Sequence, residues 1–466
     1  MTGSGTLLDP FIIWDVTDLQ NMNLDLTAYY ELGQDIDASA VNFTPIGVNF
    51  TGSFDGKGHK ISKLSIVISA AGFQYGGLFD TNRGIVKDVK LEDVAMSITA
   101  TTFGSAFCGA LVAINENVID KCSCTGSINS IGATWAHSGG LVCVNDGGAV
   151  SNSYALVTVS SVAPSAAAGG FVDDNDLGGT IDKCFAKGNV SANGTLRAYT
   201  AGFCRDSFNG SISDCYSTGN ATSITAPVNR DAGGFVKGND VNGVISNCYS
   251  LGIPSALNTG GFAEFDNGII DDCFWDTQTS GQAASAGGTG LTTAEMVYGE
   301  EFAAAGWSQN IWGLDRGRYP CLIGVSPSCV YAPIPYPPWP PVPPPPLPPP
   351  IIVTAEVSTL PATNIAENHA TLNGVLTNSL ARYGEVRFQY GVTSAYGMNT
   401  PWQDGFFTGD NFYVNITDVG EGSAYHFRAQ FRGSPIVSGS DMTFSTLSSL
   451  GPVTMVSEEL MQLLEG

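Results

Sequence analysis

Residues 169–276 repeat one short pattern four times. Each copy opens with small residues and Phe, as in Gly-Gly-Phe-Val at 169–172 and Ala-Gly-Phe-Cys at 201–204, and then passes through a polar turn to Ile-x-x-Cys and an aromatic residue. Three degenerate openings precede them, and the second residues of the seven openings are Gly77, Ala110, Gly140, Gly170, Gly202, Gly234 and Gly261. A spacing of 27 to 33 residues is typical of a solenoid, in which stacking buries an apolar face that one repeat alone cannot bury.

The repeats are short runs of Val, Ile, Thr, Ser and aromatic residues that end in Gly and Asn, without the long helical periodicity of helical repeats. This composition predicts an all-β chain whose main body is a right-handed parallel β-helix. Each repeat is then one coil of about three short strands, and equivalent residues stack in columns about 4.8 Å apart.

Two columns follow from counting along the repeats. The residue after each Gly is apolar and is expected to point inward; this column is Leu78, Leu111, Leu141, Phe171, Phe203, Phe235 and Phe262. Five residues after the Gly comes a polar column, Asn82, Asn115, Asn145, Asn175, Ser207, Asn239 and Asp266. Stacked amides can hydrogen-bond along the axis and satisfy the turn backbone, so a structural ladder is favoured over a binding role.

A third column is mostly cysteine: Val89, Cys122, Ser153, Cys184, Cys215, Cys248 and Cys273. Buried Cys behaves as a small apolar residue, so inward packing is favoured. Neighbouring coils also bring Cα atoms within disulfide range, which leaves bonds among Cys184, Cys215, Cys248 and Cys273 open. Cys321 and Cys329 are only eight residues apart and are candidates for a local disulfide. A metal site is not expected, because the chain has no Cys-x-x-Cys pair at these positions and only four His.

An aromatic residue follows the cysteine column directly in five coils: Tyr154, Phe185, Tyr216, Tyr249 and Phe274. Successive residues of a strand face opposite ways, so inward cysteines would put these rings outside as a platform for stacking on sugar rings. The alternative is that a corner of the coil turns the rings into the core.

The repeat, Gly-Gly-[Leu/Phe]-[Val/Phe] followed by Gly-x-Ile-x-[Asn/Asp]-Cys-[Tyr/Phe], resembles the GLUG repeat of bacterial surface and secreted proteins. Residues 3–11 and 54–64 resemble the opening coils of such arrays, and residues 290–320 resemble their ending. The resemblance covers about residues 3–324. It implies an adhesin or an accessory region of a surface protein, and it carries no catalytic residue.

The expected layout has five parts. Residues 1–72 are an N-terminal cap and the first coils, with a short helix near 16–22. Residues 73–325 are the repeats and a C-terminal cap, with a helix at 291–305 and with Trp307, Trp312 and Leu314 sealing the last coil. A Pro-rich linker at 326–353 has the composition of a stiff polyproline II spacer; a ligand for a Pro-reading domain is the alternative.

Residues 354–446 show the two-residue alternation of an antiparallel β-sandwich. They resemble a fibronectin type III domain, with 419–425 matching the approach to its tyrosine corner. The usual core Trp is missing, and Phe388 or Tyr390 would replace it. Residues 447–466 form a tail in which 457–465 predict a short amphipathic helix, docking in cis or in trans through Leu460, Met461, Leu463 and Leu464.

Composition limits the partners. The 466 residues carry a net charge of −24 although only 13% are charged, which argues against nucleic acid and anionic membranes. No apolar run is long enough to span a membrane, and the first residues lack the pattern of a secretory signal. The odd number of cysteines, 11, predicts at least one free or intermolecular thiol.

Asp173, Asp174, Asp176, Asp206 and Asp240 gather in successive turns, with Arg205 and Lys237 near. A polysaccharide lyase or glycosidase needs such groups, but Asp is also common in turns for conformational reasons. We therefore predict a non-enzymatic extracellular attachment or structural protein: a virion fibre or a cell-surface adhesin or filament subunit, contacting glycans or partner subunits. A polysaccharide depolymerase is the alternative. No cofactor is expected; calcium shared by Asp174 and Asp206 is a weak alternative, since neither matches a dedicated calcium loop.

Overall fold

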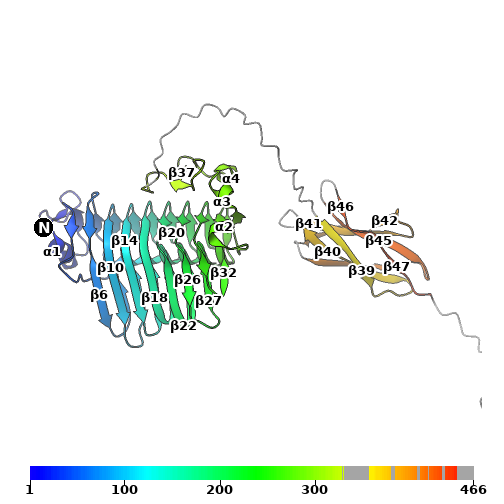
Figure 1. Cartoon of the computed structure of the whole chain (residues 1–466), viewed down its shortest axis with the longest axis horizontal. Coiled ribbons are helices and arrows are strands. Elements are labelled where there is room, and N and C mark those ends of the chain that lie inside the picture. The colour runs from blue at the N-terminus through cyan, green and yellow to red at the C-terminus, as the bar shows by residue number, and fades with distance from the viewer. Residues whose placement is uncertain are drawn as a thin grey trace, which may run out of the picture. The chain divides into compact units, whose positions relative to one another are not determined.

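The computed structural model describes residues 1–327, 329, 356–378, 384–406, 410–417, 419–432 and 436–448. The chain divides into two compact units, Met1–Ile334 and Pro335–Gly466, and each has its own apolar core. The predicted fold class is confirmed, because the first unit is a parallel β-helix and the second contains antiparallel sheets (Figure 1). Most of the predicted linker and all four apolar tail residues, Leu460, Met461, Leu463 and Leu464, lie outside the described residues.

Three parallel sheets run along the β-helix (Figure 1). The first comprises β1 Phe11–Ile13, β2 Tyr29–Leu32, β4 Ser53–Asp55, β9 Ile85–Lys87, β13 Val118–Asp120, β17 Ala149–Ser151, β20 Thr180–Asp182, β24 Ser211–Ser213, β29 Val244–Ser246 and β34 Ile269–Asp271. The second comprises β8 Phe79–Asn82, β12 Val112–Asn115, β16 Val142–Asp146, β19 Val172–Asp176, β23 Cys204–Phe208, β28 Val236–Asn239 and β33 Ala263–Asp266.

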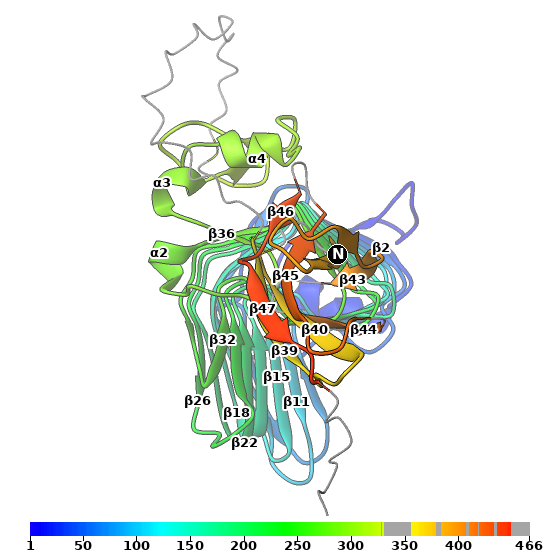
Figure 2. The same cartoon turned by 90° about the vertical axis from the view of Figure 1, so that its right-hand side faces the viewer.

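The third sheet is the largest and contains the longest strands. It comprises β3 Ile36–Asp37, β5 Lys60–Ser62, β6 Ser65–Ala70, β7 Gln74–Gly76, β10 Lys90–Ala100, β11 Ala106–Gly109, β14 Ser123–Gly132, β15 Trp135–Gly139, β18 Tyr154–Gly169, β21 Phe185–Ala186, β22 Val190–Ala201, β25 Tyr216–Ser217, β26 Ala221–Ile224, β27 Arg230–Gly233, β30 Tyr249–Ser250, β31 Pro254–Ser255, β32 Asn258–Gly260, β35 Phe274–Asp276 and β36 Thr289–Leu291. Figure 2 shows these strands extending each coil into a long arm.

The inside of this arm is narrow because small residues fill it. Ala166, Ala192, Ala198 and Ala226 form a separate buried cluster. Serines continue the same interior, and the Ser161 hydroxyl donates a 2.8 Å hydrogen bond to the Ala167 carbonyl oxygen. Small side chains let the two walls approach closely, and their hydroxyls find partners across the gap.

The main core follows the predicted apolar column. All seven of its residues, from Leu78 to Phe262, are fully buried. The four Phe rings stack nearly parallel, with ring centroids 4.7 to 4.9 Å apart. This distance is close to the spacing of paired strands, so the backbone register alone brings one ring onto the next.

Both ends of the β-helix are covered, but not entirely as predicted. At the N-terminal end, α1 Val16–Gln20 and the 3₁₀ helix η1 Asn21–Leu24 bury Leu19 and Met22, and Asp15 caps α1 by accepting from the Asp18 N–H. At the C-terminal end, an irregular segment continues the backbone ladder, since the Ala286 N–H donates to the Ala263 carbonyl oxygen at 2.9 Å.

The segment that was expected to form a helical cap, residues 291–305, covers a flank instead and contains two short helices, α3 Thr293–Met296 and α4 Glu300–Ala304. The helix α2 Thr277–Ser280, which was not predicted, precedes it, and the small antiparallel pair β37 Trp312–Gly313 and β38 Cys321–Leu322 follows. Trp307 and Trp312 are buried against aromatic residues on the outer face of the coils, in a cluster separate from the main core. The predicted sealing of the last coil by Trp307, Trp312 and Leu314 is therefore wrong, because all three pack in this flank cluster.

The second unit consists of two antiparallel sheets. One contains β39 Glu356–Thr363, β40 His369–Asn378 and β44 Asn411–Thr417, and the other contains β41 Gly384–Gly391, β42 Met398–Asn399, β43 Gln403–Phe406, β45 Ala424–Phe431, β46 Val437–Ser438 and β47 Met442–Ser445. Phe388 is fully buried in their common core. The Gly420 N–H donates a 2.7 Å hydrogen bond to the Tyr425 hydroxyl, the geometry of a tyrosine corner.

Candidate functional site

The aromatic residues that follow the cysteine column form a stack on the outer face of the β-helix. The rings of Tyr154, Phe185, Tyr216 and Tyr249 are nearly parallel, with successive centroids 4.8 to 5.0 Å apart. The inward cysteines belong to the main core, whereas these rings belong to the separate flank cluster. The stack thus points away from the core, as strand alternation requires.

This stack is nevertheless not an exposed platform. Phe185, Tyr216, Tyr249 and Phe274 are at most 7% exposed, and only Tyr154 is partly buried. The segment 291–327 covers them with Phe302, Trp307 and Trp312. The prediction of an exposed aromatic stripe for stacking on sugars is therefore wrong. The outward rings present a large apolar area, and covering that area with another segment stabilises the folded protein.

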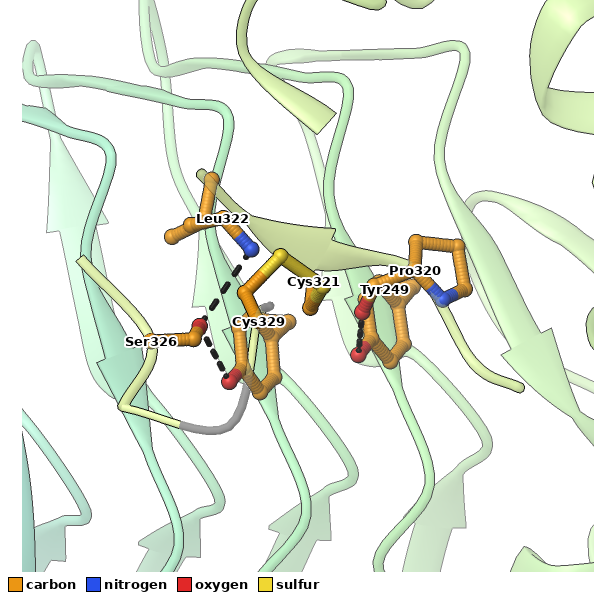
Figure 3. Close-up of a disulfide and its surroundings, with 7 residues drawn as sticks. Tyr249, Pro320, Cys321, Leu322, Ser326 and Cys329 are labelled. Atoms are coloured by element: carbon orange, nitrogen blue, oxygen red, sulfur yellow. Dashed lines mark hydrogen bonds between the residues drawn. A yellow bond between two sulfur atoms is a disulfide. The ribbon is translucent and has the colours of Figure 1, made fainter. Parts of the chain in front are cut away.

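Polar contacts fasten the covering segment to the stack. The Tyr249 hydroxyl donates a 2.6 Å hydrogen bond to the Pro320 carbonyl oxygen, and the Tyr216 hydroxyl is 2.9 Å from the Ser326 hydroxyl (Figure 3). The Cys321–Cys329 disulfide closes a loop that begins next to Pro320 and includes Ser326 (Figure 3). These two cysteines are the local pair expected from their spacing.

A pocket of about 360 Å³ remains where the segment meets the coils. Its lining includes the stacked rings of Tyr216 and Tyr249 and the charged residues Lys187, Asp315 and Arg318; Thr218, Leu251, Gly313, Tyr319, Pro320 and Cys321 complete it. Burial lowers the pKa of Lys187, whose ammonium lies 5.1 Å from the Phe185 ring centroid and 5.5 Å from that of Tyr216. Within the described part of the chain, neither Lys187 nor Arg318 forms an ion pair.

The polar column forms a hydrogen-bonded amide chain inside the β-helix. The side-chain N–H of Asn82 donates to Asn115, Asn115 to Asn145, and Asn145 to Asn175, each at 2.8 Å. Farther along, Asn239 donates to Asp266 at 2.9 Å. Between the two runs stands Ser207, whose hydroxyl is buried without a partner among the described residues, as is the amide oxygen of Asn239.

The cysteine column is a column of buried thiols. Cys184, Cys215, Cys248 and Cys273 are all free, so the alternative of bonds between neighbouring coils is not what the structure contains. Their sulfurs instead contact backbone carbonyl oxygens two residues earlier, as Cys215 does with Ser213 at 3.0 Å. Burial raises the pKa of Cys215 well above the usual thiol value, which makes it unreactive.

The clustered aspartates form a charged network rather than an open acidic site. The guanidinium of Arg205 binds Asp173, Asp174 and Asp206 at once. Lys237 lies 3.5 Å from Asp206, and Nδ1 of His137 lies 2.7 Å from Asp173. The fold brings His137 to this network although it lies 36 positions before Asp173 in the sequence.

Within this network, the pKa values of the neighbouring carboxyl groups of Asp173 and Asp174 are shifted in opposite directions. Burial pushes the pKa of Asp173 upward, but the charge of Arg205 and the bond to His137 outweigh it and leave the pKa lowered. Burial raises the pKa of Asp174 well above its usual value against the opposing effect of Arg205. Asp176 has a pKa raised to about 6, again mainly by burial.

His137, Asp173 and Asp174 offer ligand atoms within 4.8 Å of one another. Arg205, however, already supplies the positive charge beside Asp173, Asp174 and Asp206. A calcium ion shared by Asp174 and Asp206 would therefore have to displace a guanidinium that is bonded to both carboxylates.

The charged residues that line the pocket were not predicted from the sequence. Lys187 stands two residues after Phe185, so strand alternation places it on the same outer face, and this signal was available. Arg318 and Asp315 come from the covering segment, whose position is set only by packing.

The comparisons with known proteins establish no family. No family model matches the chain. Over 314 residues it is 30% identical to halomucin of Haloquadratum walsbyi, which is 63% of this chain but 3% of that protein. Over 71 residues it is 35% identical to a putative Gly-rich membrane protein of Evansella cellulosilytica, covering 14% of this chain and 8% of that protein. The chain thus spans a small fraction of these relatives.

Solved structures give weak likenesses. The sensor domain of the anti-sigma factor RsgI4 of Pseudobacteroides cellulosolvens matches 21% of this chain and 98% of its own, at 19% identity and a TM-score of 0.19. An IgA1 protease matches 59% of this chain and 21% of its own, at 17% identity and a TM-score of 0.41. Neither informs function. No described helix has the length and apolarity needed to cross a bilayer.

Proposed function

We propose that this chain is a non-enzymatic extracellular protein with a structural or attachment role, in which the β-helix is a stiff body that contacts glycans or partner subunits. The observation that carries the proposal is the unbroken stacking of the coils. The second sheet continues in parallel register from β8 to β33, with the apolar column behind it. Such a solenoid resists bending because every coil is hydrogen-bonded to its neighbours.

Three observations support this setting. The Cys321–Cys329 disulfide is of a kind that persists in oxidising compartments. The low content of charged residues with strong net acidity suits a polar exterior surface. The similarities to halomucin and to a Gly-rich membrane protein are compatible with the cell surface. The proposal also includes the assignment of the repeats to the GLUG type and of the second unit to a fibronectin type III-like domain. A virion fibre is the alternative setting to the cell surface.

A depolymerase is the second candidate, and one observation favours it. Asp173 and Asp174 are adjacent carboxyls whose pKa values are pushed in opposite directions, a pattern found in acid–base pairs. Against it, Arg205 bonds to both carboxylates and fills the place between them.

The test combines imaging with turnover. Electron microscopy of the purified protein should show filaments, symmetric oligomers or discrete particles that bind an immobilised glycan array, while acidic and neutral polysaccharides stay uncleaved by reducing-end and unsaturated-product assays. Release of products that is lost in Asp174→Asn would establish the depolymerase instead. A protein that neither assembles nor binds any surface would contradict the attachment role.

A further inference from the structure

The pocket beneath the covering segment combines charged residues from two separate parts of the chain. Lys187 comes from the coils and Arg318 from the covering segment, so each of these two parts contributes one cation to the pocket lining. The chain has only 19 Lys and Arg against 43 Asp and Glu, so two cations at one pocket that form no ion pair with any described residue stand out from the acidic background. The ammonium of Lys187 is held over the Phe185 and Tyr216 rings, which fixes its position.

The remaining lining adds directional polar groups to the stacked rings. Asp315 provides a carboxylate acceptor and Thr218 a hydroxyl. Tyr216 and Tyr249 have their hydroxyls committed to Ser326 and Pro320, so these two rings are already held in place without a ligand. Preorganised pockets of a few hundred Å³ with a few convergent polar groups are typical of small-ligand sites.

These features together select the ligand chemistry. Two cations call for an anion, and a flat carboxylate can accept from the Arg318 guanidinium and the Lys187 ammonium together. Asp315 would repel a simple anion but accepts hydrogen bonds from hydroxyl groups. A ligand that carries both a carboxylate and several hydroxyls satisfies all three residues.

We infer that this pocket is a binding site for one carboxylated pyranose unit, such as a uronic acid, of an acidic glycan. The sugar carboxylate lies between Lys187 and Arg318, and ring hydroxyls donate to Asp315. This assignment rests on the proposed attachment function and names the glycan class that the β-helix would bind.

The test is calorimetric titration of the full chain with glucuronate, with its methyl ester, with glucose and with inorganic phosphate. We expect glucuronate to bind with one-site saturation and the methyl ester and glucose to bind at least about tenfold more weakly, because each lost charge-assisted hydrogen bond is worth about a factor of ten. Lys187→Gln and Arg318→Gln should each weaken glucuronate binding by about tenfold or more. Lys90 is an exposed lysine that donates to the Gly58 carbonyl oxygen, so Lys90→Gln is the matched control and should leave glucuronate binding unchanged.

Three outcomes would overturn the assignment. Equal binding of glucose and glucuronate would exclude a role for the two cations, and phosphate binding as tightly as glucuronate would indicate a general anion site. Retention of the chain on a glycan array that survives in the Lys187→Gln, Arg318→Gln double variant would move attachment to another surface. That last result leaves the attachment function standing, whereas a wild type that neither assembles nor is retained by any glycan would contradict both.

Discussion

Ser207 interrupts the amide chain, and at this break two buried polar atoms have no hydrogen-bond partner among the described residues, the Ser207 hydroxyl and the Asn239 amide oxygen. In the coils before it, Asn fills the same register position between Asn neighbours. The backbone there is in register with Asn175 on one side and Asn239 on the other. An amide at 207 would therefore join the two runs.

Ser207→Asn is expected to raise the free energy of unfolding by about 1 kcal/mol, because it adds hydrogen bonds where buried groups are now unsatisfied. Chemical denaturation followed by circular dichroism measures this change. Ser207→Ala is the control and should be near neutral, since it removes one unsatisfied hydroxyl and adds no bond. A loss of stability in Ser207→Asn would show that this coil is too tight for the larger side chain.

Asp176 is the residue at which pH dependence can be tested most simply. Its folded-state pKa is raised to about 6, above the value of about 4 for an unfolded Asp. Between these values the folded state binds more protons, so this residue's contribution to stability falls as pH rises from about 4 to 6. The cause is burial, which disfavours the charged form.

Asp176→Asn should therefore be more stable than the wild type at pH 7, and the difference should shrink toward zero near pH 4. Thermal melting of both proteins across this range measures it. Asp37→Asn is a suitable control, because hydrogen bonds from Ser39 lower the Asp37 pKa to about 2 and its loss should act in the opposite direction. An Asp176→Asn difference that does not vary with pH would contradict the raised pKa.

At the scale of elements, the covering segment 291–327 depends on both apolar contact and covalent closure. The Cys321–Cys329 disulfide joins residues eight positions apart, and closing a loop of that length stabilises the folded protein by about 2–3 kcal/mol in the chain-entropy description. The loop that the bond closes includes Ser326 and begins next to Pro320, the two partners of the tyrosine hydroxyls that anchor the segment. Its loss should be felt locally before the coils themselves are affected.

The double variant Cys321→Ala, Cys329→Ala is expected to be cut faster by protease within the covering segment, with little change in the melting of the β-helix. Limited proteolysis read by mass spectrometry locates the cuts. Reduction of the wild type with dithiothreitol should reproduce the effect. Cys273→Ala, which removes a free thiol, should leave the cutting rate within the covering segment unchanged; equal sensitivity of all variants would mean that the disulfide does not hold the segment.

At the scale of the molecule, the two units have separate cores and should unfold separately. Phe203 is fully buried in the first core and Phe388 in the second. Removing a buried Phe ring costs about 3–5 kcal/mol, enough to shift one transition clearly. Differential scanning calorimetry is expected to show two transitions.

Phe203→Ala should lower only the transition of the β-helix, and Phe388→Ala only that of the second unit. A single transition that moves in both variants would show that the two units unfold as one. The wild type at two scan rates serves as the control for irreversible unfolding.

The repeated sequence determined the β-helix, its inward apolar column and the register of its asparagines, because a parallel stack brings residues one repeat apart onto one another whatever the rest of the chain does. It left open whether the rings after the cysteines leave the core, because strand alternation places them outside whereas a corner of the coil would turn them inward.

Only the tertiary structure decided what those outward rings contact. Tyr249 meets Pro320 across 71 positions, and Asp173 meets His137 across 36 and Arg205 across 32. No periodicity encodes contacts between a repeat and a non-repeating segment, because such a segment takes whichever apolar flank buries its own Trp and Phe side chains. As a result, the aromatic stripe that was expected to be exposed is covered, and its rings line a pocket between the coils and the covering segment.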